Sequence, residues 1–340
     1  MLNFIPTHVE KEISIALQTN KSLDQYHAMA RIIESYGFDR ITVYNDMLYQ
    51  PAWYPLMKIA QATSTIKIGV SAVNPYTCHP VTIAGNIALL QEASHGRSYL
   101  GLARGAWLDY VGITTPKPVA ALRDAFASIQ HFLAGTVEPF QSEFFPIKGG
   151  DQLRWTVPKD KIPMLVGTWG IRTFESCYPF VDEIKLGGTS NPDVGKHFVA
   201  LSQKLQSRFH KDEAVGVVAG AVTVIDLDGD KARELARKEV ALYILVIAEL
   251  DPTINLDIDV LSAIKKAAQD YNYAEAAEYV DDYLLSKFAF AGTPNEVAEQ
   301  AKALISAGVS RIELGTPHGL TSEEGIRLLG EEVIPQLKGL

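Results

Sequence analysis

The chain has 340 residues, of which 47% are hydrophobic and 21% charged, and its formal net charge is −9 at pH 7. This composition predicts a folded protein with a sizeable core, and an acidic balance without a block of Lys or Arg excludes the usual surface for nucleic acid or an anionic membrane. Cys78 and Cys177 show no metal-ligand spacing, and no stretch reads as a signal peptide or a membrane span. We therefore expect a cytoplasmic protein that acts on small molecules.

The first third of the chain alternates between short apolar strands and helices. The first helix opens at a capping box formed by Ser22 and Gln25 and ends at Gly37. We expect strands at 13–18, 40–44, 66–72 and 98–102, and helices at 22–37, 55–63, 80–93 and 120–133. This alternation is typical of a parallel sheet with right-handed crossovers.

The same pattern continues to the C-terminus but is interrupted twice. We expect further strands at 163–167, 182–188, 215–225 and 311–315, with Asn191 and Pro192 opening a helix after the sixth. Residues 136–158 place aromatic side chains among Pro, Gly and polar residues, and we interpret them as a hairpin-like insertion that could lie over a barrel mouth. The long helical stretch after Gly229 contains a second, helical insertion at 249–290.

Eight strands, each followed by a helix, predict an α/β protein with a (β/α)8 TIM barrel formed by one domain, residues 1–340. We prefer this closed barrel to an open doubly wound sheet because of the strand count. The length also fits, since such a barrel needs roughly 250 residues and the two insertions account for the excess.

Small and hydroxyl-bearing residues dominate the C-terminal ends of the expected strands, where the active site of such a barrel lies. No cluster with metal-ligand spacing is present, so we expect no metal site. There is also no GxSxG motif and no Schiff-base lysine at a strand end, since Lys185 lies inside a strand. Gly167-Thr168-Trp169-Gly170, leading into a helix, is the best phosphate-binding candidate, although such loops also occur in ordinary β/α connections.

Several individual residues allow two interpretations from the sequence alone. Asp46 could bind a ligand or only cap a loop, and His79 precedes Pro80 as a helix start would. Trp107 and Trp169 could contact a cofactor or serve as core or interface aromatics. The candidate proton donors are Tyr44, Tyr76, His79 and His318.

Taken together, several segments resemble the bacterial luciferase-like superfamily of flavin and deazaflavin enzymes. The resemblance is strongest to the branch that uses the 8-hydroxy-5-deazaflavin coenzyme F420, and the C-terminal segments are similar to methylenetetrahydromethanopterin reductase. It rests on Ile66–Gly69 with Asn74-Pro75-Tyr76, Gly101–Gly105, Ile162–Gly167, Gly292-Thr293-Pro294, Gly315-Thr316-Pro317 and Gly330–Pro335.

The resemblance implies a cofactor site at the barrel mouth. It implies a non-prolyl cis peptide at Ser71–Ala72 or Ala72–Val73 that supports the ring, an aspartate (Asp46) near the pyrimidine end of the ring, and phosphate-binding loops at Gly105 and at 168–170. The cofactor-binding set that follows is Asp46, Ser71, Ala72, Val73, Asn74, Ala103, Arg104, Gly105, Ala106, Gly167, Thr168, Trp169, Gly170, Gly187 and Gly188.

The function that the resemblance implies is hydride transfer between F420 and a small, uncharged or mildly polar organic substrate by a homodimeric enzyme. The alternatives are an FMN-dependent two-component monooxygenase and an inactive flavin-binding barrel. Where sugar-phosphate dehydrogenases of the branch have His and Glu, this chain has Met47 and Ala106, and the strand-one Glu of the pterin reductase is matched by Ala16. The resemblance therefore assigns no catalytic acid.

Overall fold

The computed structural model describes residues 11–254, 256–269 and 272–339. Most of the segment on which the signal-peptide interpretation rests, residues 1–10, lies outside this range. Within the range, no helix combines the length and the apolar character needed to cross a bilayer.

Eight parallel strands close into a barrel, which confirms the predicted fold class. Neighbouring strands follow one another around the ring, which closes where β6 pairs with β7 and where β1 pairs with β9. The ring consists of β1 (Glu12–Leu17), β2 (Arg40–Val43), β3 (Lys67–Val73), β4 (Ser98–Ala103), β5 (Met164–Gly167), β6 (Glu183–Gly187), β7 (Gly216–Ile225) and β9 (Arg311–Gly319).

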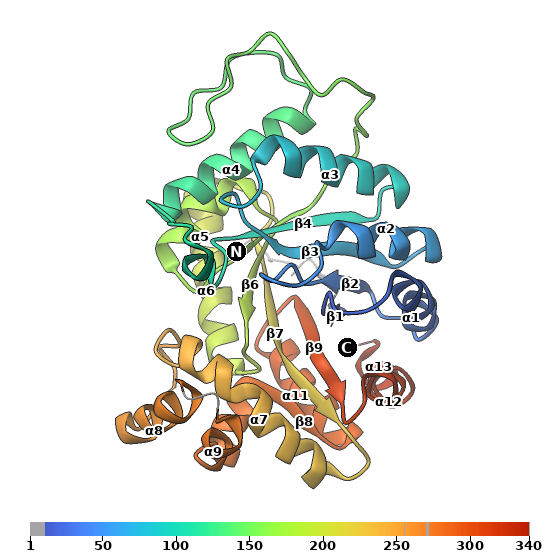
Figure 1. Cartoon of the computed structure of the whole chain (residues 1–340), viewed down its shortest axis with the longest axis vertical. Helices are drawn as coiled ribbons and strands as arrows, with labels where there is room; N and C mark the ends of the chain where they lie inside the picture. Colours follow the sequence, from blue (N-terminus) through green and yellow to red (C-terminus); the bar gives the residue numbers. More distant parts are fainter. Residues whose placement is uncertain (1–10, 255, 270–271, 340) are drawn as a thin grey trace, which may run out of the picture.

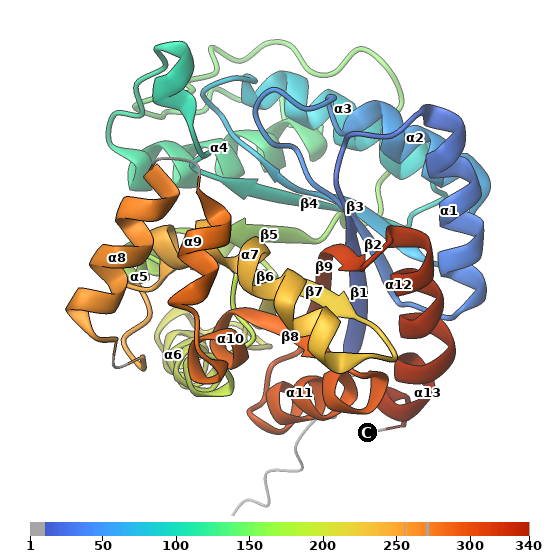
Figure 2. The same ribbon diagram turned by 60° about the horizontal axis from the view of Figure 1, so that its bottom comes forward.

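Helices surround the ring of strands (Figures 1 and 2), and their starts follow the predicted signals. Ser22 and Gln25 form the capping box of the first helix, and the Asn191 side chain accepts the Asp193 N–H at the start of α6. The helices are α1 (Leu23–Ser35), α2 (Trp53–Ala62), α3 (Pro80–Ala93), α4 (Pro118–Leu133), α5 (Ile171–Cys177), α6 (Pro192–Phe209), α11 (Pro294–Ser306), α12 (Ser322–Leu328) and α13 (Ile334–Leu337).

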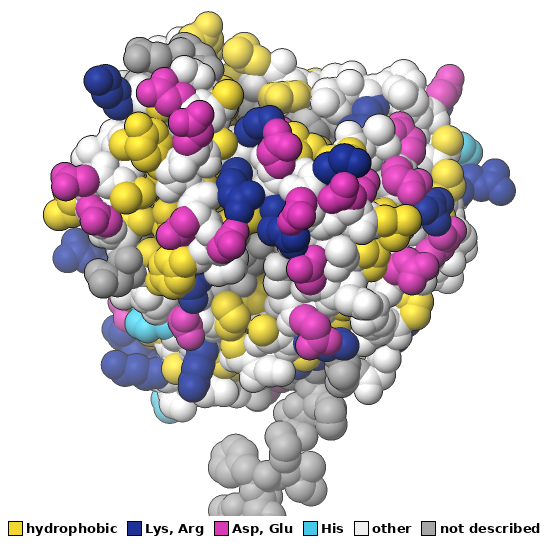
Figure 3. All heavy atoms as spheres, turned by 90° about the horizontal axis from the view of Figure 1, so that it is seen from below, with side chains coloured by type: hydrophobic (Ala, Val, Ile, Leu, Met, Phe, Trp, Pro, Cys, Tyr) yellow, Lys and Arg dark blue, Asp and Glu magenta, His cyan; other side chains and the backbone are white. Residues whose placement is uncertain are grey.

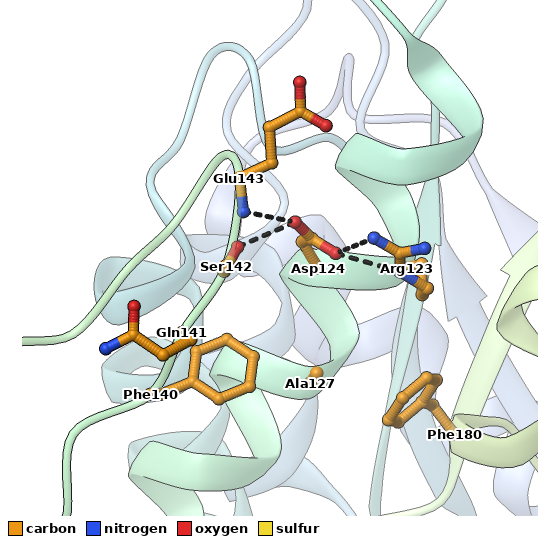
Figure 4. Close-up of a pocket in the computed structure, with 8 residues that line it drawn as sticks. All are labelled: Arg123, Asp124, Ala127, Phe140, Gln141, Ser142, Glu143 and Phe180. Atoms are coloured by element: carbon orange, nitrogen blue, oxygen red, sulfur yellow. Dashed lines mark hydrogen bonds and ion pairs between the residues drawn. The ribbon is translucent and has the colours of Figure 1, made fainter.

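The insertion at 136–158 is hairpin-like, with one antiparallel bridge between Phe140 and Ile147. It packs on the outer surface of α3 and α4 instead of over the barrel mouth, which corrects the predicted position (Figure 1). The buried carboxylate of Asp124 on α4 fixes it there by accepting hydrogen bonds from the Ser142 hydroxyl at 2.7 Å and the Glu143 N–H at 3.1 Å (Figure 4).

The second insertion follows the barrel helix α7 (Gly229–Ile247) and contains α8 (Ile258–Gln269), α9 (Tyr273–Glu278) and α10 (Asp282–Phe288). These helices pack with α7 around a hydrophobic cluster of their own (Figure 1). The predicted end at 290 is wrong, because β8 (Ala289–Gly292) begins there and pairs with the last four residues of β7. Basic and acidic side chains are interspersed on the lower face of the molecule, without a large patch of one sign (Figure 3).

Candidate functional site

The bulge at the end of β3 is the most unusual backbone feature of the barrel mouth. The peptide bond between Ser71 and Ala72 is cis, and the β3–β4 register shifts between Val70 and Val73. This is one of the two positions implied for such a bond. The loop that follows is fixed by the buried Asn74, whose Oδ1 accepts the N–H groups of residues 76 and 77 at 3.0 and 2.9 Å.

Asp46 lies at the end of β2 and faces the first strand. Its carboxylate accepts a hydrogen bond from Gln18 Nε2 at 2.8 Å. Asp46 does not cap α2, which has no side-chain cap, and the loop before this helix is held by Asn45 Oδ1, which accepts the N–H of Ala52. Burial and the nearby Asp46 carboxylate raise the pKa of Tyr243 on α7 to about 12, so α7 brings a protonated phenol to the same side of the mouth.

The β4 loop approaches the β3 loop closely at Gly105. This glycine has φ +91°, and a Cβ there would lie 3.1 Å from Asn74 Cγ and 2.9 Å from Leu108 Cδ1. A larger residue would separate the two loops. Ala103 is half-buried, Arg104 and Ala106 are exposed, and the loop continues into Trp107, which is 52% exposed.

The predicted phosphate loop after β5 is partly committed to internal hydrogen bonds. The N–H of Gly170 donates to Thr168 Oγ1 at 3.0 Å, and Trp169 Nε1 donates to the Gly187 carbonyl at 3.0 Å. The Trp169 ring also packs edge-on against Phe198. Trp169 therefore connects β5, β6 and α6, as expected if it is a core aromatic residue.

The two glycines at the end of β6 differ in their surroundings. A Cβ on Gly187 would meet no atom within 4 Å, so open space borders the strand at this point. A Cβ on Gly188, which has φ +82°, would lie 2.1 Å from Ile247 Cδ1 and 3.1 Å from Tyr243 Cδ1. The end of α7 therefore passes directly beside β6 and covers this part of the mouth.

The structure thus places the predicted residues on one rim, at the ends of β2 to β6, and adds groups that the prediction missed. Tyr243 is one of them, and Gln18, at the end of the first strand, lies outside the predicted cofactor-binding set. The others form a polar network inside the barrel, and its lower layer holds the Arg40 guanidinium bonded to Glu12 and Glu183. The Tyr99 ring is enclosed between Arg40 and Arg311, whose guanidinium carbons lie 5.1 and 5.2 Å from its centroid.

The upper layer of this network is centred on Glu313, which is fully buried. Its carboxylate accepts hydrogen bonds from Lys185 Nζ, from Thr42 Oγ1 at 2.6 Å and from Arg311 Nη1 at 3.3 Å. Burial alone would raise the pKa of Glu313, but the charges of Lys185 and Arg311 hold it below its usual value. Spacing could have revealed this network, because Glu183 with Lys185, and Arg311 with Glu313, are two residues apart and so face the same side of a strand.

Three of the four candidate proton donors have other roles. His318 is fully buried between the Ala16 carbonyl at 2.9 Å and Ser322 Oγ at 3.2 Å, and burial lowers its pKa to about 4. His79 caps α3, as the helix-start reading predicts, by accepting the Val81 N–H. The Tyr76 hydroxyl donates to the Pro116 carbonyl at 3.1 Å, in the loop between β4 and α4.

Tyr44 is the remaining candidate and lies where the network meets the mouth. Its hydroxyl is 3.5 Å from Glu313 Oε1, and its ring is 5.0 Å from Lys185 Nζ. Burial and the Glu313 charge raise its pKa well above the ordinary value, so it remains protonated. The described residues hold no His, Cys, Asp and Glu cluster able to bind a metal ion.

A surface pocket on α4 lies apart from the predicted site at the barrel mouth. That pocket has a volume of about 560 Å³, but it is lined by Asp124, Phe140, Phe180 and neighbouring residues on the outer face of the barrel (Figure 4). At the mouth, by contrast, the third strand is bulged, open space borders Gly187, and Gly105 lets the β3 and β4 loops approach closely.

The closed barrel of eight parallel strands, with a bulge at the end of the third strand, is the arrangement that the resemblance to luciferase-like enzymes implies. Residues 3–311 match the model of the family described as luciferase-like monooxygenase, so the chain belongs to this family.

Relatives with known activities share nearly the whole length of the chain. It is 28% identical over 318 residues to 5,10-methylenetetrahydromethanopterin reductase from Archaeoglobus fulgidus, covering 91% of this chain and 94% of that protein. The structure of coenzyme F420-dependent tetrahydromethanopterin reductase from Methanopyrus kandleri superposes with a TM-score of 0.85 at 25% identity, covering 97% of this chain and all of that one. The fold is also like that of an F420-dependent secondary alcohol dehydrogenase in complex with an F420–acetone adduct, with a TM-score of 0.78 at 17% identity over 97% and 99% of the two chains.

Proposed function

We propose that this protein is an F420-dependent oxidoreductase that transfers hydride between the deazaflavin and a small organic substrate. The observation that carries the proposal is the bulge between Val70 and Val73 at the end of β3, together with open space at Gly187, in a chain whose relatives over nearly its full length include a coenzyme F420-dependent reductase. Bound F420 would supply a hydride donor or acceptor at carbon 5 of its ring.

The chain's own residues would orient the cofactor and exclude water from it. Residues 71–74 would support the ring, and Asp46 would face its polar edge. Gly105 and Trp169 would hold the anionic tail through their backbone N–H groups, because the N–H groups of Thr168 and Gly170 already donate to the Lys185 carbonyl and to Thr168 Oγ1. The end of α7 lies against Gly188, so Tyr243 covers one side of the mouth. These groups provide shape and hydrogen bonds and leave the redox chemistry to the cofactor.

The described mouth residues are not suited to general acid catalysis near neutral pH. The Tyr44 hydroxyl keeps its proton because burial and Glu313 raise its pKa, and the His318 imidazole is neutral and buried. Met47, Ala106 and Ala16 occupy the positions at which related dehydrogenases and reductases have acids or bases. The proton that accompanies hydride transfer would therefore be exchanged with solvent or with another group of the substrate.

An FMN-dependent monooxygenase is the second candidate, favoured by the family description, and an inactive flavin-binding barrel is the third. The purified protein should be titrated anaerobically with F420 and with FMN while absorbance and fluorescence are recorded, and then given substrate libraries or oxygen. Tight F420 binding and oxidation of reduced F420 only by an organic acceptor support the proposal. Tight FMN binding with rapid oxygen consumption contradicts it, and binding without turnover supports the third candidate.

A homodimer is part of the same proposal, since the resemblance implies one. Light scattering during size-exclusion chromatography measures the mass directly, and a single 37.3 kDa species would contradict it.

A further inference from the structure

The Lys185 ammonium group connects four strands at the upper end of the barrel interior. It is bonded to Glu313 on β9, lies 3.4 Å from Ser71 Oγ on β3, and lies 5.0 Å from the centroid of the Tyr44 ring after β2. The Lys185 side chain is only 9% exposed and that of Glu313 is not exposed at all. The charge is therefore held directly beneath the residue that begins the cis peptide bond.

Two glycines make room for this arrangement. A Cβ on Gly220 of β7 would lie 3.2 Å from Glu313 Cβ and 3.4 Å from Lys185 Cε, and a Cβ on Gly315 of β9 would lie 3.1 Å from the Tyr44 hydroxyl. The neighbouring strands thus carry no side chain where the ammonium group and the phenol lie.

Leaving aside the exposed Lys67, which also bonds Glu12, the interior network is balanced in charge, and Lys185 is its cation nearest the mouth. Its ionised members are Arg40, Arg311, Lys185, Glu12, Glu183 and Glu313. Arg40 and Arg311 bind Glu183 lower in the barrel, whereas Lys185 reaches Ser71. A buried ion pair is often no more stabilising than apolar residues of the same volume, so stability alone does not explain this pair.

We propose that Lys185 is a positioning residue for the cofactor, which orients the Ser71 hydroxyl and the Glu313 carboxylate and supplies positive charge under the reacting ring. This inference rests on the proposed function, because it requires a redox cofactor on the β3 bulge. It assigns a role to a buried lysine that would otherwise be only an internal counterion.

Removing the ammonium group leaves a net negative charge beneath the ring. In Lys185→Met, Glu313 stays ionised because Arg311 and Thr42 still donate to it. A negative charge opposes the gain of hydride by the ring, so reduction of the bound cofactor becomes less favourable. For one charge at roughly 10 Å in a protein interior we expect about a tenfold fall in the reduced-to-oxidised ratio, which is about 30 mV for a two-electron couple.

The experiment measures the midpoint potential and the dissociation constant of bound cofactor in the wild type and in three variants. Lys185→Met should lower the midpoint potential, which corresponds to about a tenfold fall in the ratio of reduced to oxidised cofactor. Lys185→Arg should keep most of the wild-type potential because it keeps the charge. Lys67→Met is the matched control: this lysine also bonds a network carboxylate, Glu12, but at the opposite end of the barrel, and its side chain is 54% exposed. It should leave both values unchanged.

The double variant Lys185→Met/Glu313→Gln keeps the inference testable if the single variant does not fold. It removes both charges, so the potential should return close to the wild-type value while binding weakens, because the Ser71 hydroxyl loses its donor. The inference would be overturned if folded Lys185→Met changed the ratio of reduced to oxidised cofactor by less than about twofold. It would also be overturned if the double variant bound the cofactor as tightly as the wild type.

The wild-type measurements separate this inference from the proposed function. If the wild type binds FMN and not F420, the proposed function fails, and the same potentials measured with FMN still decide the role of Lys185. If the wild type binds neither cofactor, both ideas are refuted.

Discussion

Replacing Arg311 by Met should strongly destabilise the protein. The guanidinium is fully buried and donates to Glu183 at 3.0 and 2.8 Å, to Glu313 at 3.3 Å and to Ser14 Oγ at 3.1 Å. Removing one partner of a buried ion pair costs about 3–5 kcal/mol, because a charge is left without compensation. Arg40 and Lys185 still bond the two carboxylates, so we expect a loss near the lower end of this range. Urea unfolding at pH 7 should show an unfolding free energy that is lower by about 3 kcal/mol.

The loss should shrink as the pH falls. In the wild type the pKa values of Glu183 and Glu313 are below their ordinary value, so the stability they contribute is present above the unfolded pKa and disappears at lower pH. Without Arg311 the folded-state pKa values rise, so protonation stabilises the variant relative to the wild type. The two unfolding free energies should therefore converge from pH 7 toward about pH 4.

An exposed arginine provides the control for this substitution. Arg208 has 65% of its side chain exposed and lies 3.8 Å from Glu175, so Arg208→Met should change the unfolding free energy by less than about 0.5 kcal/mol. If Arg311→Met costs less than about 1 kcal/mol at pH 7, or shows no convergence at acidic pH, the reasoning about the barrel interior is wrong.

Three further substitutions test other parts of the structure. Asp124→Ala should release residues 136–158 from α4, giving faster limited proteolysis there and a loss of about 1–3 kcal/mol, because their hydrogen bonds to the buried carboxylate are removed. Gly188→Ala should cost about 1–3 kcal/mol in thermal unfolding, since its Cβ would clash with Ile247. His318→Asn should make the stability of the protein less sensitive to acid. The pKa of His318 is about 4 in the folded protein and about 6.5 in the unfolded chain, so the wild type loses stability as the pH falls below about 6.5. The difference in unfolding free energy between wild type and variant should therefore narrow by about 2 kcal/mol from pH 7 to pH 5.

Each of these has a matched comparison. Asp151→Ala, in an exposed pair with Arg154, should leave proteolysis of the insertion unchanged, and equal rates for the two aspartate variants would contradict the anchoring role. Gly112→Ala has φ +75° but no atom within 4 Å, so it isolates backbone strain from the clash at Gly188. Parallel pH profiles for wild type and His318→Asn would show that this imidazole is not the group that titrates.

Features set by neighbouring residues could be predicted from the sequence. The capping box at Ser22 and the Asn191 cap were both confirmed, because such signals need only three or four consecutive residues. β8 was missed because Ala289–Gly292 follows a helix without a turn signal, and only its pairing with β7 makes it a strand. The position of the 136–158 insertion depends on Asp124, a contact between distant segments that no local pattern reveals.

The candidate site likewise has a part that could be predicted from the sequence and a part that could not. The rim residues were predicted because strand ends and the resemblance identify them, and the cis bond at Ser71 was confirmed. The interior network was missed because Lys185 and Glu313 lie in apolar strands, and their meeting depends on closure of the barrel. Whether the rim residues bind F420 stays a prediction.

β7 pairs with three strands, β6, β9 and β8, and this affects how the chain can change over time. Its first half completes the ring with β6, while only its last four residues hold β8 and thereby one end of the helices beyond Ile247. Segments of different length could therefore be exchanged between α7 and β8 without opening the eight-stranded ring.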